Sequence, residues 1–288
     1  MVDKAGRSVY DVSRRGQLLA GWARATARRV GEGNCPRYGV ERSVEESQPL
    51  ASVIIPAWNE ERRMAASLQR VVAFVQQQAD PIEVIVVDDG SEDATAAIVE
   101  EFAAKYPFIR LIRNPHGGKG AAVKSGVAQG RGRYLVISDT DLAVPIEELP
   151  KFLPPVLDGY DLAIASREAP GARRINEPYY RHLMGRVYNL LVRLIAVPGI
   201  QDTQCGFKAF RHDVARAIFP YQTIDGWGFD VEILFIARRF GYQIVEVPVT
   251  WYYGEKSKIN PLKDALRMTR ELWRVRRNAR RGVYERRL

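Results

Sequence analysis

Short apolar runs alternate with stretches of helical hydrophobic periodicity from residue 51 onward. Short runs of aliphatic residues bounded by turn formers are typical of strands buried on both faces, and apolar residues repeating at three- and four-residue steps indicate helices. Such alternation implies right-handed crossovers, so we expect an α/β fold with a mostly parallel sheet flanked by helices. The pattern predicts strands at 52–56, 83–88, 108–113, 134–138, 161–165 and 244–249, and helices at 59–78, around 98–102, at 117–128, and near 178–196, 212–219 and 230–240.

The two ends of the chain lack this alternation. Residues 1–48 show weak patterning, and we expect a basic N-terminal extension that is disordered or lies at an interface. Residues 49–258 hold the alternating elements and are predicted to form a single domain. Residues 259–288 are predicted to form a basic amphipathic C-terminal helix, with a stripe made of Leu262, Leu266, Thr269, Leu272 or Trp273, and Arg276 that is flanked by many arginines.

The positive charge of the chain is concentrated at these ends. The formal net charge of +9 divides into +5 for residues 1–30, +7 for residues 261–288 and −3 for the residues between them. Arginine and tryptophan on an amphipathic helix suit an anionic membrane surface, because each basic residue near it contributes about 1 kcal/mol. The alternative is an ordinary solvated helix packed on the domain. No nucleic-acid recognition motif is present, so nucleic acid is not an expected partner.

Cysteine usage and hydrophobic runs give no sign of secretion or of a membrane-spanning helix. Cys35 and Cys205 belong to no C-x-x-C pattern, so neither a disulfide framework nor a zinc site is expected. The best apolar run, Leu190–Ile200, is interrupted by Arg193 and Pro198 and falls short of the roughly 20 residues that a spanning helix needs. We therefore expect a cytoplasmic protein that lies peripherally on the cytoplasmic face of a membrane.

Two aspartates follow directly after the predicted strand at 134–138. Asp139 and Asp141 are two residues apart, at the end of a strand beyond which open parallel sheets bind their ligands. A hard divalent cation prefers such oxygen ligands and often also binds substrate phosphates. The alternative interpretation makes Asp139 a turn residue and Asp141 a helix N-cap.

A second acidic pair, Asp88 and Asp89, follows the predicted strand at 83–88. Acidic groups at this place bind a base edge or a ribose in nucleotide-binding folds, whereas turn and cap chemistry would account for only one of the two. The residues present exclude two other kinds of nucleotide-binding motif. The first strand leads into Pro56–Glu61 instead of the G-x-G-x-x-G of dinucleotide enzymes, and Lys119 is followed by Gly120 instead of the Ser or Thr of a P-loop.

Several motifs together resemble family 2 glycosyltransferases of the GT-A fold, whose domain is Rossmann-like. The segments similar to that family's donor-site motifs are Val53–Glu60, Val86–Ser91, Gly118–Gly120 and Asp139–Asp141. Later segments resemble more specifically the dolichyl-phosphate β-glucosyltransferases and related polyprenyl-phosphate glycosyl synthases, namely Ala165–Arg167, Arg181, Asp202–Lys208 and Trp227–Glu232. The similarity runs from about residue 51 to residue 260, and the order and spacing of the motifs make it specific.

The resemblance implies a role for each matching residue. The acceptor phosphate would be bound by Arg167, Arg181 and Gln204, and Asp139 and Asp141 would hold Mg²⁺ or Mn²⁺ against the diphosphate. The catalytic residues would be Asp141, Arg167 and, as a base towards a hydroxyl acceptor, Asp230. The nucleotide-sugar donor, a UDP-hexose in preference to GDP-mannose, would be bound by Pro56, Asn59, Glu60, Asp88, Asp89, Lys119, Asp139 and Thr140.

The implied reaction is an inverting, metal-dependent transfer of a hexose, most simply glucose from UDP-glucose, to a dolichyl or polyprenyl phosphate. The acceptor phosphate is already anionic, so it needs positioning by arginines more than it needs a base. Ala143 stands where mannosyl-type synthases carry a metal-site Gln, which favours the glucosyl branch. Two alternatives stay open. One is transfer to a hydroxyl acceptor with Asp230 as base, and the other is a non-catalytic protein that binds membranes or nucleic acid.

Overall fold

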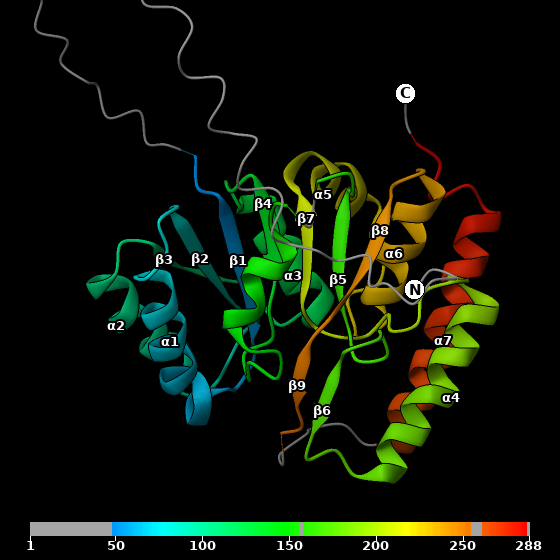
Figure 1. Ribbon diagram of the computed structural model, residues 1–288, viewed down its shortest axis with the longest axis horizontal. Coiled ribbons are helices and arrows are strands. Elements are labelled where there is room, and N and C mark those ends of the chain that lie inside the picture. Colours follow the sequence, from blue (N-terminus) through cyan, green and yellow to red (C-terminus); the bar gives the residue numbers. More distant parts are fainter. Residues whose placement is uncertain (1–47, 156–157, 255–260, 287–288) are drawn as a thin grey trace, which may run out of the picture. The chain divides into compact units, whose positions relative to one another are not determined.

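A seven-stranded sheet forms the centre of the protein (Figure 1). The computed structural model describes residues 48–155, 158–254 and 261–286. The strands lie in the order β3-β2-β1-β4-β7-β5-β8. Their bounds are Ala51–Ala57 for β1, Ile82–Asp88 for β2, Ile109–Arg113 for β3, Tyr134–Ile137 for β4, Leu162–Ser166 for β5, Lys208–Arg211 for β7 and Ile244–Pro248 for β8.

All neighbouring strands of this sheet are parallel except at β7, which runs antiparallel to both β4 and β5. The sheet therefore confirms the expected α/β class and its mostly parallel arrangement. Each of the six strands expected from the hydrophobic pattern is present. The short β7 was not predicted, because only Ala209 and Phe210 of its four residues are apolar.

Helices cover both faces of the sheet (Figure 1). Val53 and Ile55 of β1 belong to one hydrophobic core and Ile54 belongs to the other, because successive strand residues point to opposite faces. The first core is closed by α1 (Glu61–Val75), α2 (Thr95–Lys105) and the 3₁₀ segment η2 (Ile146–Phe152). The second core is closed by α3 (Lys119–Gln129), α4 (Tyr179–Ile195), α5 (His212–Ile218), the 3₁₀ segment η3 (Phe219–Tyr221), α6 (Phe229–Arg239) and α7 (Pro261–Arg280).

The expected C-terminal helix is present as α7, and its described part packs on the folded domain. Leu272 and Val275 are buried in the second core, and Tyr284, just beyond the helix, is buried there too. Trp273 points away from that core and is 61% exposed. The amphipathic pattern of this helix thus has an inner side that stabilises the domain and an outer side rich in arginine.

Two further short strands form a separate ribbon. β6 (Arg173–Ile175) pairs in parallel with β9 (Thr250–Tyr252), below the main sheet in Figure 1. Neither was predicted, since a three-residue strand carries too little hydrophobic pattern to be recognised. The ribbon brings the segment after β5 and the segment after β8 together beside the carboxyl ends of the main strands.

None of the helices in the described residues is both long enough and apolar enough to cross a membrane. The expectation for residues 1–47 lies outside the described residues, as do residues 259–260 and 287–288 of the predicted C-terminal segment. Residues from Glu46 onward group as one compact unit. The described residues therefore form a single α/β domain.

Candidate active site

The carboxyl ends of β1, β2 and β4 place the predicted acidic residues on one edge of the sheet, as expected for parallel neighbours. β4 ends at Ile137, and Asp139 and Asp141 follow in the turn beyond it. Between them, the Thr140 hydroxyl donates to the carbonyl of Pro56 at the end of β1, over 2.7 Å. This bond ties the Asp139–Asp141 turn to the loop that carries Asn59 and Glu60.

Lys119 is the cation next to this carboxylate pair. Its Nζ lies 2.6 Å from Oδ1 of Asp139 and 4.9 Å from the centre of the Trp227 ring. Burial lowers the pKa of Lys119, but the negative charges of Asp139, Asp230 and Asp141 more than offset it, so the pKa is raised. Lys119 is therefore a permanent positive charge at this site at neutral pH.

The surroundings of Asp141 favour the binding of a cation. Burial and the charge of Asp139 raise the pKa of Asp141, although Arg63 and Lys119 partly oppose this. The Arg63 guanidinium lies 3.7 Å from Asp141 Oδ2 and 2.8 Å from a carboxylate oxygen of Glu60. The charge of Asp139 disfavours the ionisation of Asp141, and a divalent cation bound by both carboxylates would relieve that repulsion.

These two carboxylates are too few to hold a metal ion by themselves. Among the described residues, no group of three or more His, Cys, Asp or Glu side chains has the arrangement of a metal centre. A divalent cation at Asp139 and Asp141 would therefore take its remaining oxygens from substrate phosphates and water, which is the usual pattern for Mg²⁺. The residues present fit such an ion, with all ligands being oxygen.

Gly206 lies directly against Asp139. A β-carbon at position 206 would overlap the carboxylate of Asp139, so only glycine leaves that carboxylate in its present position. Gly206 belongs to the turn between Asp202 and Lys208, which leads into β7. The turn that precedes β7, the antiparallel strand that was not predicted, therefore packs against the Asp139 side chain.

The second acidic pair is buried and holds the loops around it. Asp89 accepts backbone N–H bonds from Gly117 and Gly118 at 2.9 and 2.8 Å, and His116 Nδ1 lies 2.9 Å from it. Gly118, at φ +107°, begins the turn into α3, so Asp89 fixes where Lys119 stands. Asp88 accepts the N–H of Ser91. Contact of these two residues with a nucleoside stays a prediction.

Asn59 and Glu60 stand at the start of α1 and bind the loop after β2. The backbone N–H of Asn59 donates to the Ser91 hydroxyl and its side-chain oxygen accepts from Glu92, while the N–H of Glu60 donates to the Thr95 hydroxyl. Trp58 stacks on His116 with ring centres 4.6 Å apart. The two predicted donor loops are therefore joined to each other, as a shared ligand would require.

Open space lies beside Asp141. A cavity of about 390 Å³ is lined by Arg70, Asp141, Leu142, Ala143 and Tyr252–Gly254. Tyr252 belongs to β9, and its N–H donates to the carbonyl of Ala143 over 2.8 Å. The β6–β9 ribbon therefore forms one wall of the space next to the carboxylate pair.

Arg167, predicted to bind an acceptor phosphate, follows β5 and is paired with Asp202. Its Nε and Nη2 donate to the two oxygens of Asp202 at 2.7 and 2.9 Å, and its guanidinium lies 5.2 Å from the Trp251 ring. Burial raises the pKa of Asp202, but Arg167 offsets this by charge and hydrogen bonds and holds it at about 2. Two of the three guanidinium nitrogens are thus used by Asp202, and Nη1 is the third.

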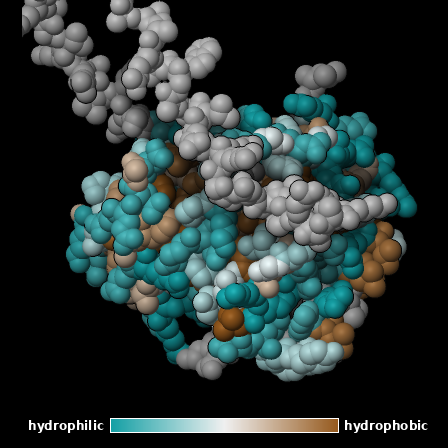
Figure 2. Space-filling view, in the orientation of Figure 1, coloured by the Kyte–Doolittle hydropathy of each residue, from teal (hydrophilic) through white to brown (hydrophobic). Residues whose placement is uncertain are grey.

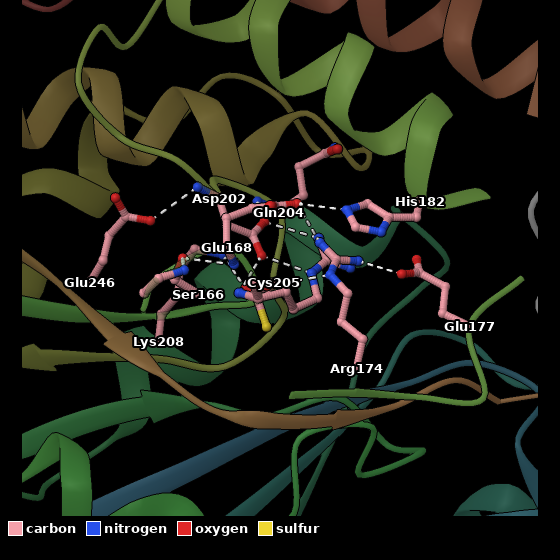
Figure 3. A network of polar contacts seen from close by, with 12 residues as sticks. Ser166, Glu168, Arg174, Glu177, His182, Asp202, Gln204, Cys205, Lys208 and Glu246 are labelled. Carbon is pink, nitrogen blue, oxygen red and sulfur yellow. Dashed lines mark hydrogen bonds and ion pairs between the residues drawn. The ribbon is translucent and has the colours of Figure 1, made fainter. Parts of the chain in front are cut away.

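A network of ion pairs lies next to this arginine (Figure 3). Arg174 donates to Glu168 and Glu177 at 2.6 Å each, and its Nε donates to the carbonyl of Arg167. His182 of α4 lies 3.6 Å from Glu168. The network connects the end of β5 to the first turn of α4.

The remaining predicted acceptor residues are Gln204 and Arg181. Gln204 lies in the same turn as Asp202, to whose carboxylate its backbone N–H donates over 3.3 Å. The side chain of Arg181, in the first turn of α4, lies outside the described residues. Their contact with a phosphate therefore stays a prediction.

Asp230 is bound by a buried lysine. Lys208 Nζ donates to Oδ1 of Asp230 and to the carbonyl of Cys205, both at 2.6 Å, and both side chains are almost fully buried. The sequence assigned no role to Arg63, Arg174 or Lys208, although Lys208 ends the Asp202–Lys208 motif. Arg63 reaches Asp141, and Lys208 reaches Asp230, only when distant segments meet. Arg174 instead pairs with the nearby Glu168 and Glu177.

The chain matches the model of glycosyl transferase family 2 over residues 52–219. It is 33% identical to a dolichyl-phosphate beta-glucosyltransferase of Dictyostelium discoideum over 251 residues, which cover 81% of this chain and 77% of that protein. The dolichyl-phosphate beta-glucosyltransferase of Drosophila melanogaster is 36% identical, covering 81% of this chain and 76% of its own length.

Solved structures share the architecture at lower identity. The glucosyl-3-phosphoglycerate synthase of Mycobacterium tuberculosis, crystallised with Mn²⁺, uridine diphosphate and glucosyl-3-phosphoglycerate, superposes with a TM-score of 0.59. The identity is 19%, over 82% of this chain and 81% of that one. This likeness confirms the expected fold.

Proposed function

The chain belongs to glycosyl transferase family 2, and from this premise we propose that it transfers glucose from UDP-glucose to a dolichyl or polyprenyl phosphate. The resemblance found in the motifs is thereby confirmed at the level of the family. The acceptor class is supported by curated relatives named dolichyl-phosphate beta-glucosyltransferase, which are at least 33% identical over most of this chain.

The observation that carries the proposal is the carboxylate pair with its adjacent cation. Asp139 and Asp141 lie beyond β4, and Lys119 lies 2.6 Å from Asp139. Breaking a glycosidic bond places negative charge on the departing diphosphate, and fixed positive charge at that place stabilises the transition state. Lys119 and Arg63 supply such charge from the chain itself, and a divalent cation held by the two aspartates would add to it.

Divalent metal dependence is part of the proposal. The raised pKa of Asp141 reflects burial and the neighbouring Asp139, and a cation would remove that conflict. The Mycobacterium tuberculosis enzyme of the same fold was crystallised with Mn²⁺ and uridine diphosphate. Mg²⁺ and Mn²⁺ both take oxygen ligands, so either ion fits the donor set.

The acceptor phosphate would approach from the side of Arg167, Arg181 and Gln204. It is anionic at neutral pH, so it can attack without a general base and needs only to be held against the repulsion of the donor diphosphate. Among the hydrogen bonds of the described residues, those of the Arg167 guanidinium to Asp202 use Nε and Nη2, so Nη1 offers a further donor, and Asp202 fixes the guanidinium plane. In-line attack by the phosphate oxygen on an α-linked donor inverts the sugar carbon and gives a β-linked lipid-phosphate glucose.

The competing reaction with a hydroxyl acceptor requires Asp230 to act as a base. The buried ion pair with Lys208 weighs against that role, because protonating Asp230 would leave Lys208 as an unpaired buried cation. Asp230 also contributes to the raised pKa of Lys119. We therefore assign Asp230 a positioning role between Lys208 and Lys119.

We place the protein at the cytoplasmic face of a membrane, where nucleotide sugars and a lipid phosphate are both accessible. The chain's net charge of +9 and its exposed basic C-terminal helix support attraction to anionic lipids. No helix in the described residues crosses the bilayer, so association would be peripheral.

The decisive experiment is a transfer assay with radiolabelled UDP-glucose, UDP-N-acetylglucosamine or GDP-mannose. Purified protein receives each donor with Mg²⁺, Mn²⁺ or EDTA, and with vesicles that contain or lack polyprenyl phosphate. We expect metal-dependent label in the lipid phase from UDP-glucose alone. Donor turnover that never labels the lipid would overturn the acceptor assignment.

Asp141→Asn tests the site within the same assay. Losing one carboxylate of the pair should reduce lipid labelling at least a hundredfold, because it removes a metal ligand at the reacting diphosphate. Asp213→Asn is the matched control, since Asp213 is an exposed acid on α5 whose ion-pair partner within the described part of the chain is Arg211. Equal labelling by the two variants would contradict the site.

A further inference from the structure

α4 exposes large apolar side chains on one side, in both its first and its last turns. Tyr179 is 81% exposed and Leu194 is 72% exposed, at the two ends of the helix. The exposed apolar positions between them lie on the same face of the helix, so these side chains form one stripe about 22 Å long, at about 1.5 Å rise per residue. We call this set the α4 stripe: Tyr179, Tyr180, Leu183, Met184, Leu190, Leu191 and Leu194.

A solvent-facing stripe of this kind is unusual for a helix packed on a domain. A surface helix normally turns its apolar side to the core and its polar side to water. α4 already turns Val192 to the second core, so its outward apolar side is additional. Contiguous exposed apolar patches mark interaction sites. Figure 2 shows hydrophobic residues reaching the surface at the edge of the molecule where α4 and α7 lie in Figure 1.

The charges around the stripe are positive. α4 carries Arg181, Arg186 and Arg193 and no acidic residue between Tyr179 and Ile195. α7 packs beside α4, and it adds the exposed Trp273. The exposed arginines in the described part of α7 are Arg270, Arg274, Arg276, Arg277 and Arg280. Apolar and aromatic side chains bordered by arginine are the composition of helices that lie in a membrane interface.

The positive charge around the α4 stripe indicates which partner docks on it. A second copy of the chain docked stripe to stripe would bring the arginines of both copies together, because a two-fold interface pairs a surface with itself. No acidic residue on α4 is available to compensate. An anionic lipid surface instead attracts the arginines and accepts the apolar side chains below its headgroups.

The stripe also begins next to the acceptor side of the candidate active site. His182, in the first turn of α4, lies 3.6 Å from Glu168, which binds Arg174, whose Nε donates to the carbonyl of Arg167. A lipid phosphate anchored in a bilayer that contacts α4 would therefore present its headgroup near Arg167. The position of the stripe explains how a membrane-bound acceptor and a water-soluble donor can meet at one site.

We propose that the α4 stripe is the membrane-docking surface of this protein and inserts into the headgroup and acyl boundary of an anionic bilayer. The inference rests on the proposed lipid acceptor for its purpose, but it stands on the exposed side chains and charges of α4 and α7. It assigns the apolar contact to α4, while the basic C-terminal helix supplies attraction.

The test is vesicle co-sedimentation of the full chain without donor or acceptor. Vesicles of phosphatidylcholine with phosphatidylserine are compared for wild type and for the double variant Leu190→Ser/Leu194→Ser. We expect at least tenfold weaker binding of the variant, because two exposed leucines no longer insert. The control Tyr160→Ser removes an apolar side chain that is 40% exposed and lies outside both α4 and the C-terminal segment, and it should bind as wild type.

Equal binding of the stripe variant and wild type would overturn the proposal. A second result would also overturn it: wild type does not bind the vesicles and is a dimer in solution, whereas the stripe variant is a monomer. In that case the stripe would be the contact between two copies of the chain. Folding is checked by near-UV circular dichroism, and exposed positions should leave the spectrum unchanged.

A second measurement separates this proposal from the proposed function. Transfer to a short-chain polyprenyl phosphate dispersed in detergent should be unaffected by Leu190→Ser/Leu194→Ser, whereas transfer to vesicle-embedded acceptor should fall at least tenfold. Vesicle binding without any transfer would overturn the function and leave the surface standing. Equal transfer by wild type and variant in both formats would overturn the surface and leave the function standing.

Discussion

Gly206 illustrates how one residue without a functional group can set the geometry of the site. A β-carbon there would overlap the Asp139 carboxylate, whose Oδ1 lies 2.6 Å from Lys119 Nζ. In Gly206→Ala the carboxylate must rotate away, so it leaves both the lysine and the place where a cation would bind. We expect Mn²⁺-dependent binding of uridine diphosphate to weaken at least tenfold, measured by isothermal titration calorimetry.

Gly185→Ala is the matched control for this substitution. Gly185 lies within α4, and a β-carbon there meets no atom within 4 Å. Alanine favours a helix interior over glycine by about 0.5–1 kcal/mol, so this variant should bind uridine diphosphate normally and unfold at slightly higher temperature. Unchanged affinity in Gly206→Ala would show that Asp139 does not contribute to donor binding in its present position.

At this scale the sequence identified residues but not their partners. Asp139, Asp141 and Lys119 were predicted from their motifs, and the structure brings all three together. The pairing of Asp230 with Lys208 was not predicted, because its members lie on α6 and β7 and meet only through the antiparallel strand. A side chain's chemical type can be read from the sequence, whereas its neighbour depends on which loops the sheet brings together.

The pair of Arg167 and Asp202 joins two elements, the end of β5 and the turn that leads into β7. Asp202 has a pKa of about 2 in the folded protein, below its ordinary value near 4. A lowered folded-state pKa stabilises the fold above the unfolded-state value, and this contribution is lost as pH falls from about 4 towards about 2. A shift of this size corresponds to about 2 kcal/mol of unfolding free energy at neutral pH.

Asp202→Asn should therefore be less stable than wild type by about 2 kcal/mol or more at pH 7, with the difference shrinking below about pH 4. Urea unfolding followed by circular dichroism between pH 7 and pH 2.5 measures it. Asp213→Asn, at an exposed acid of α5, should show a small difference that does not depend on this pair. If the difference in unfolding free energy between wild type and Asp202→Asn stayed constant with pH, the stabilising role of the Arg167–Asp202 ion pair would be contradicted.

The elements themselves were largely predictable. The long buried strands and amphipathic helices appeared where the hydrophobic pattern placed them, because burial on both faces of a parallel sheet leaves a strong signal. β7 escaped prediction since it has four residues and its direction is imposed by pairing with β4 and β5. β7 nevertheless carries Lys208 and follows Gly206. The strand with the weakest hydrophobic pattern therefore positions two residues that contact the aspartates of the site.

On the scale of the whole molecule, charge and hydrophobic surface are segregated. The chain carries a net charge of +9, and α7 presents arginines while its inner side holds Leu272 and Val275 in the core. Deleting residues 261–288 would remove those core residues together with the buried Tyr284, so it would disturb the fold as well as the charge. Reversing single exposed charges separates the two effects.

Arg276→Glu and Lys105→Glu change the net charge equally at distant places. Arg276 is exposed on α7, and Lys105 is exposed at the end of α2. These two helices lie on opposite sides of the molecule in Figure 1. A basic residue near an anionic membrane contributes about 1 kcal/mol, and reversal should remove roughly twice that, so Arg276→Glu should bind anionic vesicles about tenfold or more weakly. Lys105→Glu should bind nearly as wild type, because a charge beyond about 10 Å from the lipid surface is screened at 0.1 M salt.

Raising the salt concentration should abolish the difference in vesicle binding between the two variants. If both substitutions weakened binding equally, the attraction would belong to overall charge, and α7 would not be the surface that faces the membrane.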